Sequence, residues 1–248
     1  MSRSIPILMY HHVASRPAGV ARLGGLYVTP CQFTHQMSSL RLAGFQGLSV
    51  SAAMPYLRGE RRRGRVVVIT FDDGFVDNLE NGLPILRRFG FGATCFAVSP
   101  GVGQCREWCD GPLMDPNQLR AWRSAGMEVG AHSRTHPYLT GCSEAELRYE
   151  VEGSRADLEQ ILGEPVTQFA YPYGDCDARV ADAVRTAGYQ GAVTTRSARV
   201  RPGEDPFLLP RVNVNGRNPL PVVLYKIFLS SVSGVPGRGS FRPLSPSQ

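Results

Sequence analysis

Short apolar runs rich in β-branched residues alternate with segments of helical periodicity along most of this chain, and this alternation is what most constrains its fold. The clearest run is 66–69, Val-Val-Val-Ile, which is typical of a strand buried on both faces. Further strands are predicted at 5–10, 93–98, 127–131, 168–170, 192–195 and 208–214, and helices at 30–43, 83–89, 116–125, 143–162 and 178–187. Repeated strand–helix units predict a mainly parallel sheet with right-handed crossovers. At 248 residues, we expect this sheet to close into one α/β barrel.

The chain is expected to form one domain over residues 1–215, with its core at about 63–214. A terminal apolar helix is predicted within 216–232, centred on 221–229. The remaining segment, 233–248, is rich in Ser, Gly, Pro and Arg, and such a composition predicts a disordered tail.

Two polar runs follow predicted strands. Residues 70–74 read Thr-Phe-Asp-Asp-Gly, and residues 132–136 read His-Ser-Arg-Thr-His. Taken alone, the first is typical of a turn, and the second of two surface histidines on one helix face. Taken together they indicate more, because catalytic residues of an α/β barrel gather at the carboxyl ends of its strands. One Asp and two His would fill the three protein positions of a catalytic zinc site, which leaves the second Asp available as a base.

Composition and charge limit the other functions that the chain can have. No run reaches the eighteen or so apolar residues of a membrane span, and the N-terminus lacks the apolar core of a signal peptide. We therefore expect a cytoplasmic protein, unless a leader has been removed.

The net charge of +6 includes a concentration of Arg at positions 58, 61, 62, 63 and 65. Such a run is typical of a solvated loop, and it is also suited to anionic lipid, nucleic acid or an acidic glycan. No aromatic residue interleaves with these arginines, which argues against a nucleic-acid groove. Peripheral membrane contact remains as an expectation. The sequence does not set the oligomeric state.

Six cysteines are scattered along the chain. Cys95 lies within a predicted strand and is expected to be a small buried apolar residue. Cys105 and Cys109 form the one close pair, but their spacing differs from the C-x-x-C of structural zinc sites. Free thiols are expected there in preference to a loop disulfide.

With the run 169–174, Phe-Ala-Tyr-Pro-Tyr-Gly, the two polar runs resemble three ordered motifs of the polysaccharide deacetylases, the NodB-homology domains of carbohydrate esterase family 4. The resemblance spans roughly 5–214. It implies an α/β fold, a distorted (β/α)7 barrel, and a divalent metal ion, most often zinc, with cobalt or nickel as alternatives. It also implies hydrolysis of N-acetyl, or sometimes O-acetyl, groups on a glycan.

The resemblance also implies a role for each matching residue. Asp73, His132 and His136 would be the metal ligands, and Asp72 the general base. This agrees with the chemistry, because a bound cation acidifies water and polarises a carbonyl, and an ionised Asp beside it accepts the proton. The backbone N–H of Tyr173 would help to hold the oxyanion.

Two positions depart from the family pattern. Ala170 stands where the third motif usually has an Arg that orients the base, and Arg211 stands where the last motif usually has the His that acts as acid. Arg211 would then supply the missing cation and pair with Asp72 through two hydrogen bonds. The missing imidazole would come from the run 9–12, Met-Tyr-His-His, as in poly-N-acetylglucosamine deacetylases. We assign His11 as the acid, with His12 as the alternative.

Two other functions remain open on the sequence. One is a degenerate barrel that binds carbohydrate without turnover, which the loss of the usual Arg and His would suit. The other is a metal hydrolase of a non-glycan amide. Four aromatic residues are candidates for stacking on a sugar or for the core, namely Trp108, Trp122, Tyr138 and Tyr173. The sequence does not select among chitin oligomers, peptidoglycan, an exopolysaccharide and a lipid-linked precursor.

Overall fold

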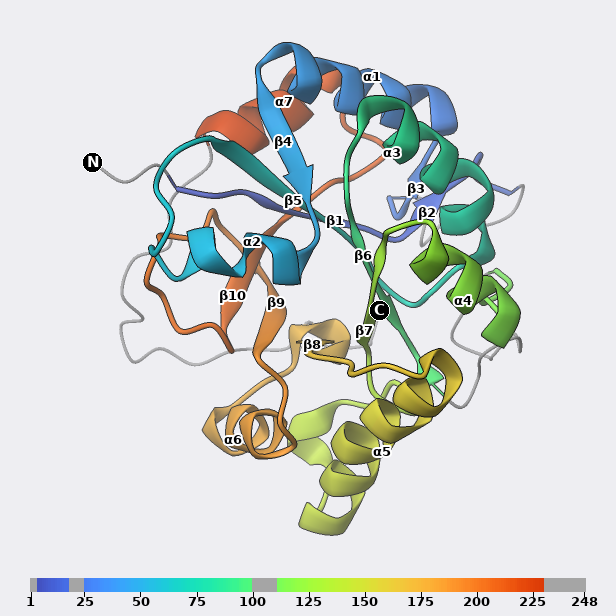
Figure 1. Ribbon diagram of the computed structural model, residues 1–248, viewed down its shortest axis with the longest axis vertical. Coiled ribbons are helices and arrows are strands. Elements are labelled where there is room, and N and C mark those ends of the chain that lie inside the picture. The colour runs from blue at the N-terminus through green and yellow to red at the C-terminus, as the bar shows by residue number, and fades with distance from the viewer. Residues whose placement is uncertain (1–3, 18–24, 100–110, 230–248) are drawn as a thin grey trace, which may run out of the picture.

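Seven parallel strands close into a barrel in the computed structural model, which describes residues 4–17, 25–99 and 111–229 (Figure 1). Around the barrel the order is β1, β10, β9, β8, β7, β6 and β5, and β5 closes the ring by pairing with β1. The predicted barrel is therefore confirmed. The strands are β1 (Ile7–Tyr10), β5 (Arg65–Phe71), β6 (Thr94–Ala97), β7 (Glu128–Ala131), β8 (Gln168–Ala170), β9 (Gly191–Ser197) and β10 (Leu209–Asn213).

Alternate residues of the strands enter two different hydrophobic cores. In β5, Val66 and Val68 join the cluster that contains Phe96 and Leu209, one residue from each of two other barrel strands. The residues between them, Val67 and Ile69, join the larger cluster that also contains the buried residues of the surrounding helices. Both faces of each strand are thus covered, which explains why the strands read as continuous apolar runs.

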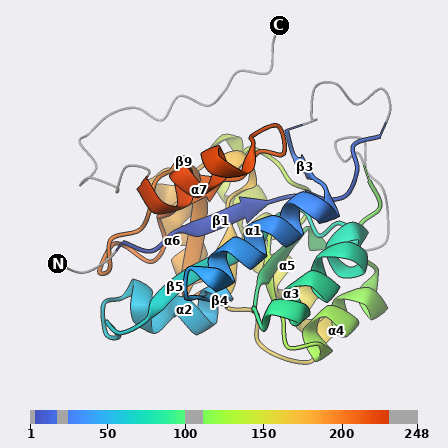
Figure 2. The same cartoon turned by 90° about the horizontal axis from the view of Figure 1, so that it is seen from above.

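Helices follow most strands and surround the barrel. They are α1 (Pro30–Leu42), α2 (Val50–Leu57), α3 (Leu83–Phe89), α4 (Pro116–Ser124), α5 (Glu144–Leu162), α6 (Ala178–Thr186) and α7 (Leu220–Leu229). Three of them begin with a reciprocal capping box, formed by Thr29 with Gln32, Asp115 with Gln118, and Ser143 with Glu146. The predicted terminal helix is α7, which packs beside α1 (Figure 2). No described helix has the length and apolar character needed to cross a bilayer.

Among the β-strands and α-helices of the described residues, four were not predicted: β2 (His12–Val13), β3 (Tyr27–Val28), β4 (Phe45–Leu48) and α2. Of these, α2 closes one end of the barrel. Its Val50, Met54 and Leu57 belong to the same cluster as the inward residues of β5. The backbone N–H of Val50 donates to Oγ1 of Thr94, the first residue of β6, at 2.8 Å. The amino end of the barrel is therefore sealed by a helix.

Cys95 is buried and its thiol is free, as expected for a small apolar residue of a strand. The expected free thiols at Cys105 and Cys109 lie outside the described residues, and so does the predicted disordered tail at 233–248.

Candidate metal centre and catalytic site

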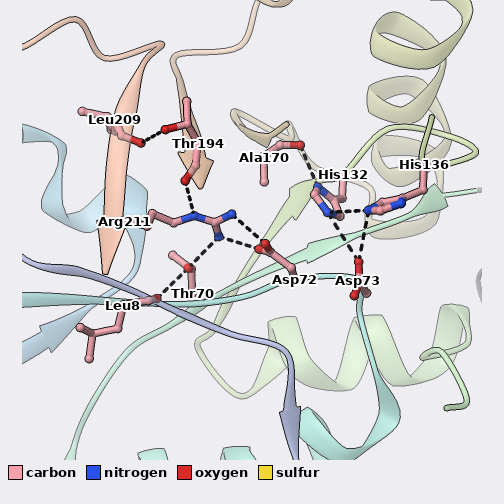
Figure 3. A network of polar contacts seen from close by, with 10 residues as sticks. All are labelled: Leu8, Thr70, Asp72, Asp73, His132, His136, Ala170, Thr194, Leu209 and Arg211. Atoms are coloured by element: carbon pink, nitrogen blue, oxygen red, sulfur yellow. Dashed lines mark hydrogen bonds and ion pairs between the residues drawn. The ribbon is translucent and has the colours of Figure 1, made fainter. Parts of the chain in front are cut away.

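Three potential metal ligands from two strand ends meet in the structure. Asp73 comes two residues after β5, and His132 directly follows β7. Oδ1 of Asp73 lies 3.5 Å from Nε2 of His132 and 3.6 Å from Nε2 of His136, and the two Nε2 atoms are 3.2 Å apart (Figure 3). The side chains of all three residues are buried. The sequence motifs thus converge at the carboxyl end of the barrel, as predicted.

The donor set fits a divalent ion such as zinc. Zinc binds His nitrogen and carboxylate oxygen at about 2.0–2.2 Å with tetrahedral geometry, so two of its ligand atoms lie roughly 3.4 Å apart. The three separations between Asp73, His132 and His136 bracket this value. These residues also supply three ligands, which is the number typical of a catalytic zinc site with an open position.

Hydrogen bonding and burial hold His132 in the form that binds metal. Its Nδ1 donates to the carbonyl oxygen of Ala170 at 2.8 Å, so the neutral ring carries its proton on Nδ1 and presents a lone pair at Nε2. Burial lowers the pKa of His132, and burial together with the nearby His132 lowers that of His136. Both imidazoles are therefore neutral at pH 7 and able to act as ligands.

The backbone around the ligands is strained. Four non-glycine residues of the described chain have positive φ, and all lie in the three motifs: Asp73 (71°), Ser133 (62°), His136 (62°) and Tyr173 (58°). Left-handed conformations of such residues are rare and persist only where the surrounding structure imposes them. They also show that His132 and His136 do not share a helix face, which was the structural alternative for their spacing.

Two carboxylates of α5 hold the loop that carries His136. Oε2 of Glu150 accepts the backbone N–H groups of Arg134 and Thr135, both at 2.8 Å. The guanidinium of Arg134 forms two hydrogen bonds with Asp157, at 2.6 and 2.8 Å. Sequence reasoning missed both acids. Glu150 is only 5% exposed, so its helical phase on the buried face of α5 is the signal that could have revealed it.

The adjacent carboxylate, Asp72, is paired with Arg211. Nη1 of Arg211 lies 2.6 Å from Oδ1 of Asp72, and Nη2 lies 2.7 Å from Oδ2 (Figure 3). The guanidinium is fully buried, and it also donates to the carbonyl oxygen of Thr194 and to Oγ1 of Thr70. The two-bond pairing expected from the sequence is thus present, with Arg211 contributed by β10.

This pairing keeps Asp72 ionised. Burial by itself would raise the pKa of Asp72, but the positive charge of Arg211 and its hydrogen bonds outweigh burial and hold the pKa below its usual range. The second lone pair on each carboxylate oxygen is not needed by Arg211 and can accept a proton.

His11, from the end of β1, shares these surroundings. Burial, the largest influence, lowers the pKa of His11 to about 4, and the negative charge of Asp72 offsets only part of this effect. The charges of Arg211 and His132 also act on the ring. Its backbone carbonyl accepts a 2.7 Å hydrogen bond from the side chain of Asn78. The backbone of the candidate acid is therefore anchored, and its ring lies within electrostatic range of the candidate base.

His12 has different surroundings. Its ring is stacked between those of Tyr27 and Phe75, with ring centroids 4.1 and 3.7 Å away, and it is only 1% exposed. Nδ1 of His12 lies 2.6 Å from Oδ2 of Asp77, whose other oxygen accepts the N–H of Val13. These contacts give His12 a packing role next to His11.

The sequence model described as polysaccharide deacetylase matches residues 59–192, which is more than half of the chain. This chain belongs to the polysaccharide deacetylase family. It is therefore a hydrolase of the class that acts on amide carbon–nitrogen bonds.

Two curated relatives agree with this membership. The deacetylase is 26% identical over 212 residues to YxkH of Bacillus subtilis (strain 168), whose name places it among polysaccharide deacetylases, and the match covers 85% of this chain and 71% of YxkH. It is 22% identical over 197 residues to the poly-β-1,6-N-acetyl-D-glucosamine N-deacetylase of Staphylococcus aureus (strain N315). That match covers 76% of this chain and 68% of the relative.

Two solved structures share its fold. The deacetylase PplD of Streptococcus pyogenes, determined in complex with acetate, has a TM-score of 0.82 at 23% identity, and the match covers 93% of this chain and 100% of that one. IcaB from Ammonifex degensii has a TM-score of 0.80 at 24% identity, and the match covers 90% and 97% of the two chains. These likenesses support the (β/α)7 barrel.

The third motif of this deacetylase forms a tight turn beside the candidate metal ligands. The rings of Tyr173 and Tyr138 are stacked with centroids 4.2 Å apart, and the ring of His136 lies edge-on to Tyr173 at 4.5 Å. Gly174 has φ of 72°, and a Cβ there would lie 2.0 Å from Oγ1 of Thr195, so only glycine fits.

The aromatic residues considered for sugar stacking divide into two groups. Tyr138 and Tyr173 are 37% and 47% exposed, whereas Trp122 is fully buried and its indole N–H donates to the carbonyl oxygen of Glu128. Of the two roles left open for Trp122, sugar stacking and the core, the structure supports the core. Trp108 lies outside the described residues.

Proposed function

We propose that this chain removes N-acetyl groups from amino-sugar residues of a glycan by metal-dependent hydrolysis. One observation carries the proposal: an Asp–His–His donor set lies next to a second, ionised carboxylate, Asp72, which buried Arg211 holds in place. Membership of the polysaccharide deacetylases supports a glycan substrate. The Staphylococcus aureus relative, an N-deacetylase by name, supports an N-acetyl group on an amino sugar.

Asp73, His132 and His136 would hold the ion, for which we propose zinc, with cobalt or nickel able to replace it. Once bound, such an ion acidifies a water molecule and polarises an acyl oxygen. Asp72 would accept the proton of the attacking water on a carboxylate oxygen, and its pairing with Arg211 prevents the carboxylate from rotating away. The backbone N–H of Tyr173 would donate to the oxygen of the acyl group as negative charge develops there.

His11 would give a proton to the nitrogen of the leaving amine. The lowered pKa, about 4, makes the ring neutral in the resting enzyme, so the proton must reach His11 during the reaction. Asp72 is the nearby group that takes a proton from water, and its charge acts on the His11 ring. The proton would therefore pass from water to Asp72 and, by way of His11, to the amine.

Tyr173 and Tyr138 would provide a surface for the sugar. Their stacked rings are partly exposed and lie next to His136, a candidate metal ligand. Aromatic faces of this kind suit the apolar face of a pyranose ring. This arrangement favours a substrate longer than a free acetamide.

Acetate release from β-linked N-acetylglucosamine oligomers, measured after incubation with zinc or cobalt, tests the proposal. We expect metal-dependent release that Asp72→Asn abolishes while the metal content stays unchanged. A chain that binds metal and oligomers but releases no acetate would be a carbohydrate-binding barrel. Release of an acyl group from simple acetanilides but from no oligomer would point to a non-glycan amide.

A further inference from the structure

The end of the barrel opposite the catalytic groups carries a basic cavity. It measures about 350 Å³ and lies at the amino ends of β1 and β5, between the end of α2, the β9–β10 connection and α7. Four arginines line it, namely Arg61, Arg62, Arg65 and Arg199, and its lining includes no Asp or Glu. The remaining wall is largely apolar and aromatic. The catalytic function proposed above uses none of these residues.

The arginines are positioned against aromatic rings and backbone carbonyls. The guanidinium of Arg61 lies 5.4 Å from the ring centroid of Tyr56, and that of Arg65 lies 5.7 Å from that of Phe45. Nη1 of Arg65 also donates to the carbonyl oxygen of Ala43 at 2.7 Å. Each guanidinium carries five N–H donors, and a cation–π contact uses none of them. Such groups are suited to bind phosphate oxygens at the mouth of the cavity.

Exposed apolar side chains border this cavity. On α7, Val222, Tyr225 and Leu229 are 39%, 60% and 65% exposed, and their spacing of three and four residues places them on one helix face. Phe228, which precedes Leu229 in α7, lines the cavity and packs on Phe45 with ring centroids 5.5 Å apart. The apolar face of α7 is therefore continuous with the basic cavity.

A fourth exposed apolar residue comes from the neighbouring helix, α1. Leu42, at the end of α1, is 85% exposed, and the next residue, Ala43, accepts the hydrogen bond from Arg65. Helices α1 and α7 lie side by side, as both views show (Figures 1 and 2). The other large exposed apolar side chains of the described residues are tyrosines at 138, 149 and 173, away from this cavity.

We propose that this face docks on a bilayer that contains anionic phospholipid. The guanidinium groups around the cavity contact lipid phosphates, and Leu42, Tyr225 and Leu229 enter the interfacial region. Charge complementarity supports this occupant, since residues 58–65 carry five Arg against one carboxylate, Glu60. A water-soluble polyanion would use the same cations, but it would leave the exposed aliphatic side chains without a partner.

Docking in this way would set the orientation of the molecule. The carboxyl ends of the strands, where Asp73 and His132 lie, would point away from the lipid. The catalytic groups would then face the aqueous phase while the barrel rests on the surface by its sealed end. The proposal does not depend on the identity of the substrate.

Co-sedimentation of the full chain with vesicles tests the proposal. We expect binding to vesicles of phosphatidylcholine containing phosphatidylglycerol, weakened by salt, and at least about tenfold weaker binding to phosphatidylcholine alone. Arg61→Gln with Arg62→Gln should lower binding to the anionic vesicles by about 30-fold. The matched control removes the same charge from exposed positions elsewhere, with Arg120→Gln and Arg148→Gln on α4 and α5, and should bind as the wild type does.

A second variant separates a lipid surface from a soluble polyanion. Leu229→Ser leaves the charge unchanged, so it should weaken vesicle binding and leave binding to heparin and to a single-stranded oligonucleotide unchanged. The proposal is overturned if wild type does not bind anionic vesicles, or if both double variants lose binding equally. It is also overturned if heparin or the oligonucleotide binds more tightly than vesicles and Leu229→Ser has no effect. Thermal unfolding of each variant verifies that the barrel is intact.

Discussion

Arg211 and Asp72 form a fully desolvated ion pair joined by two hydrogen bonds of 2.6 and 2.7 Å, between the last strand of the barrel and the end of β5. Removing one member of a buried pair leaves an uncompensated charge, which typically costs about 3–5 kcal/mol. The pair is therefore expected to contribute to the stability of the barrel, and it holds the pKa of the proposed base below its usual range.

Arg211→Met should therefore destabilise the protein by about 3–5 kcal/mol in free energy of unfolding. Chemical denaturation at pH 7 measures this loss. The double variant Arg211→Met with Asp72→Asn removes both charges and should recover more than half of it. Equal instability of the single and double variants would contradict a charge-based cause.

His136→Ala should lose the metal ion. Loss of a residue that only hydrogen-bonds to a metal ligand typically weakens metal affinity by about 10–100-fold. Removing one of the three ligands themselves should weaken zinc affinity by more than about 100-fold. Competition with a chromophoric chelator measures the affinity. His35→Ala is the matched control, because His35 is exposed on α1. Full zinc occupancy of His136→Ala at the wild-type affinity would remove His136 from the ligand set.

Glu150→Ala should weaken metal binding without removing a ligand. Glu150 accepts two backbone N–H groups and the Thr135 hydroxyl, and these bonds shape the loop before His136. We expect zinc affinity to fall by about 10–100-fold. Glu150→Gln retains one acceptor oxygen and should recover part of the lost zinc affinity. Glu152→Ala, at an exposed position of the same helix, should bind zinc as the wild type does. An unchanged affinity in Glu150→Ala would show that the loop does not need this carboxylate.

His11→Ala should lower kcat for acetate release by about 10²–10⁴-fold, the usual contribution of a general acid or base. Zinc stoichiometry should stay at the wild-type value, because His11 is not among the proposed ligands. A wild-type kcat in this variant would assign proton donation to another group.

Asp77→Ala tests how His11 is held in place. Asp77 binds Nδ1 of His12 and the N–H of Val13, both in the segment that follows β1. Its replacement by Ala removes the carboxylate that these two groups contact. We expect a loss of about 1–3 kcal/mol in stability. The fall in kcat should be smaller than in His11→Ala, with KM little changed. A kcat as low as that of His11→Ala would mean that Asp77 takes part in the chemistry itself.

The features predicted from the sequence are those that local patterns specify. The run Val66–Ile69 can be recognised as a strand because β-branched residues fill both of its faces, and the motifs at 70–74 and 132–136 place their polar groups directly after strands. By contrast, α2 was not predicted because its eight residues include Pro55 and only one short polar side chain, Ser51, so the sequence shows no clear polar face opposite the apolar one.

The supporting residues of the site were harder to find for a similar reason. Asp77 looks like an ordinary surface acid in the sequence, and the helical phase of Glu150 indicates only that it is buried. Tertiary contacts are needed to show that the two carboxylates hold the backbone beside His11 and His136. Arg211, by contrast, could be identified from the sequence. It occupies the position of a missing motif residue, so the resemblance pointed to it directly.

The position of the Asp72–Arg211 pair has a consequence for how the enzyme matures. β1 lies between β5 and β10, so the pair spans the seam at which the first and last strands complete the ring. A chain that has not yet added its final strand contains the proposed metal donors but lacks the cation that pairs with Asp72. Under the proposed function, we therefore expect hydrolytic competence to arrive with the last strand, and a nascent or C-terminally truncated chain to remain inert.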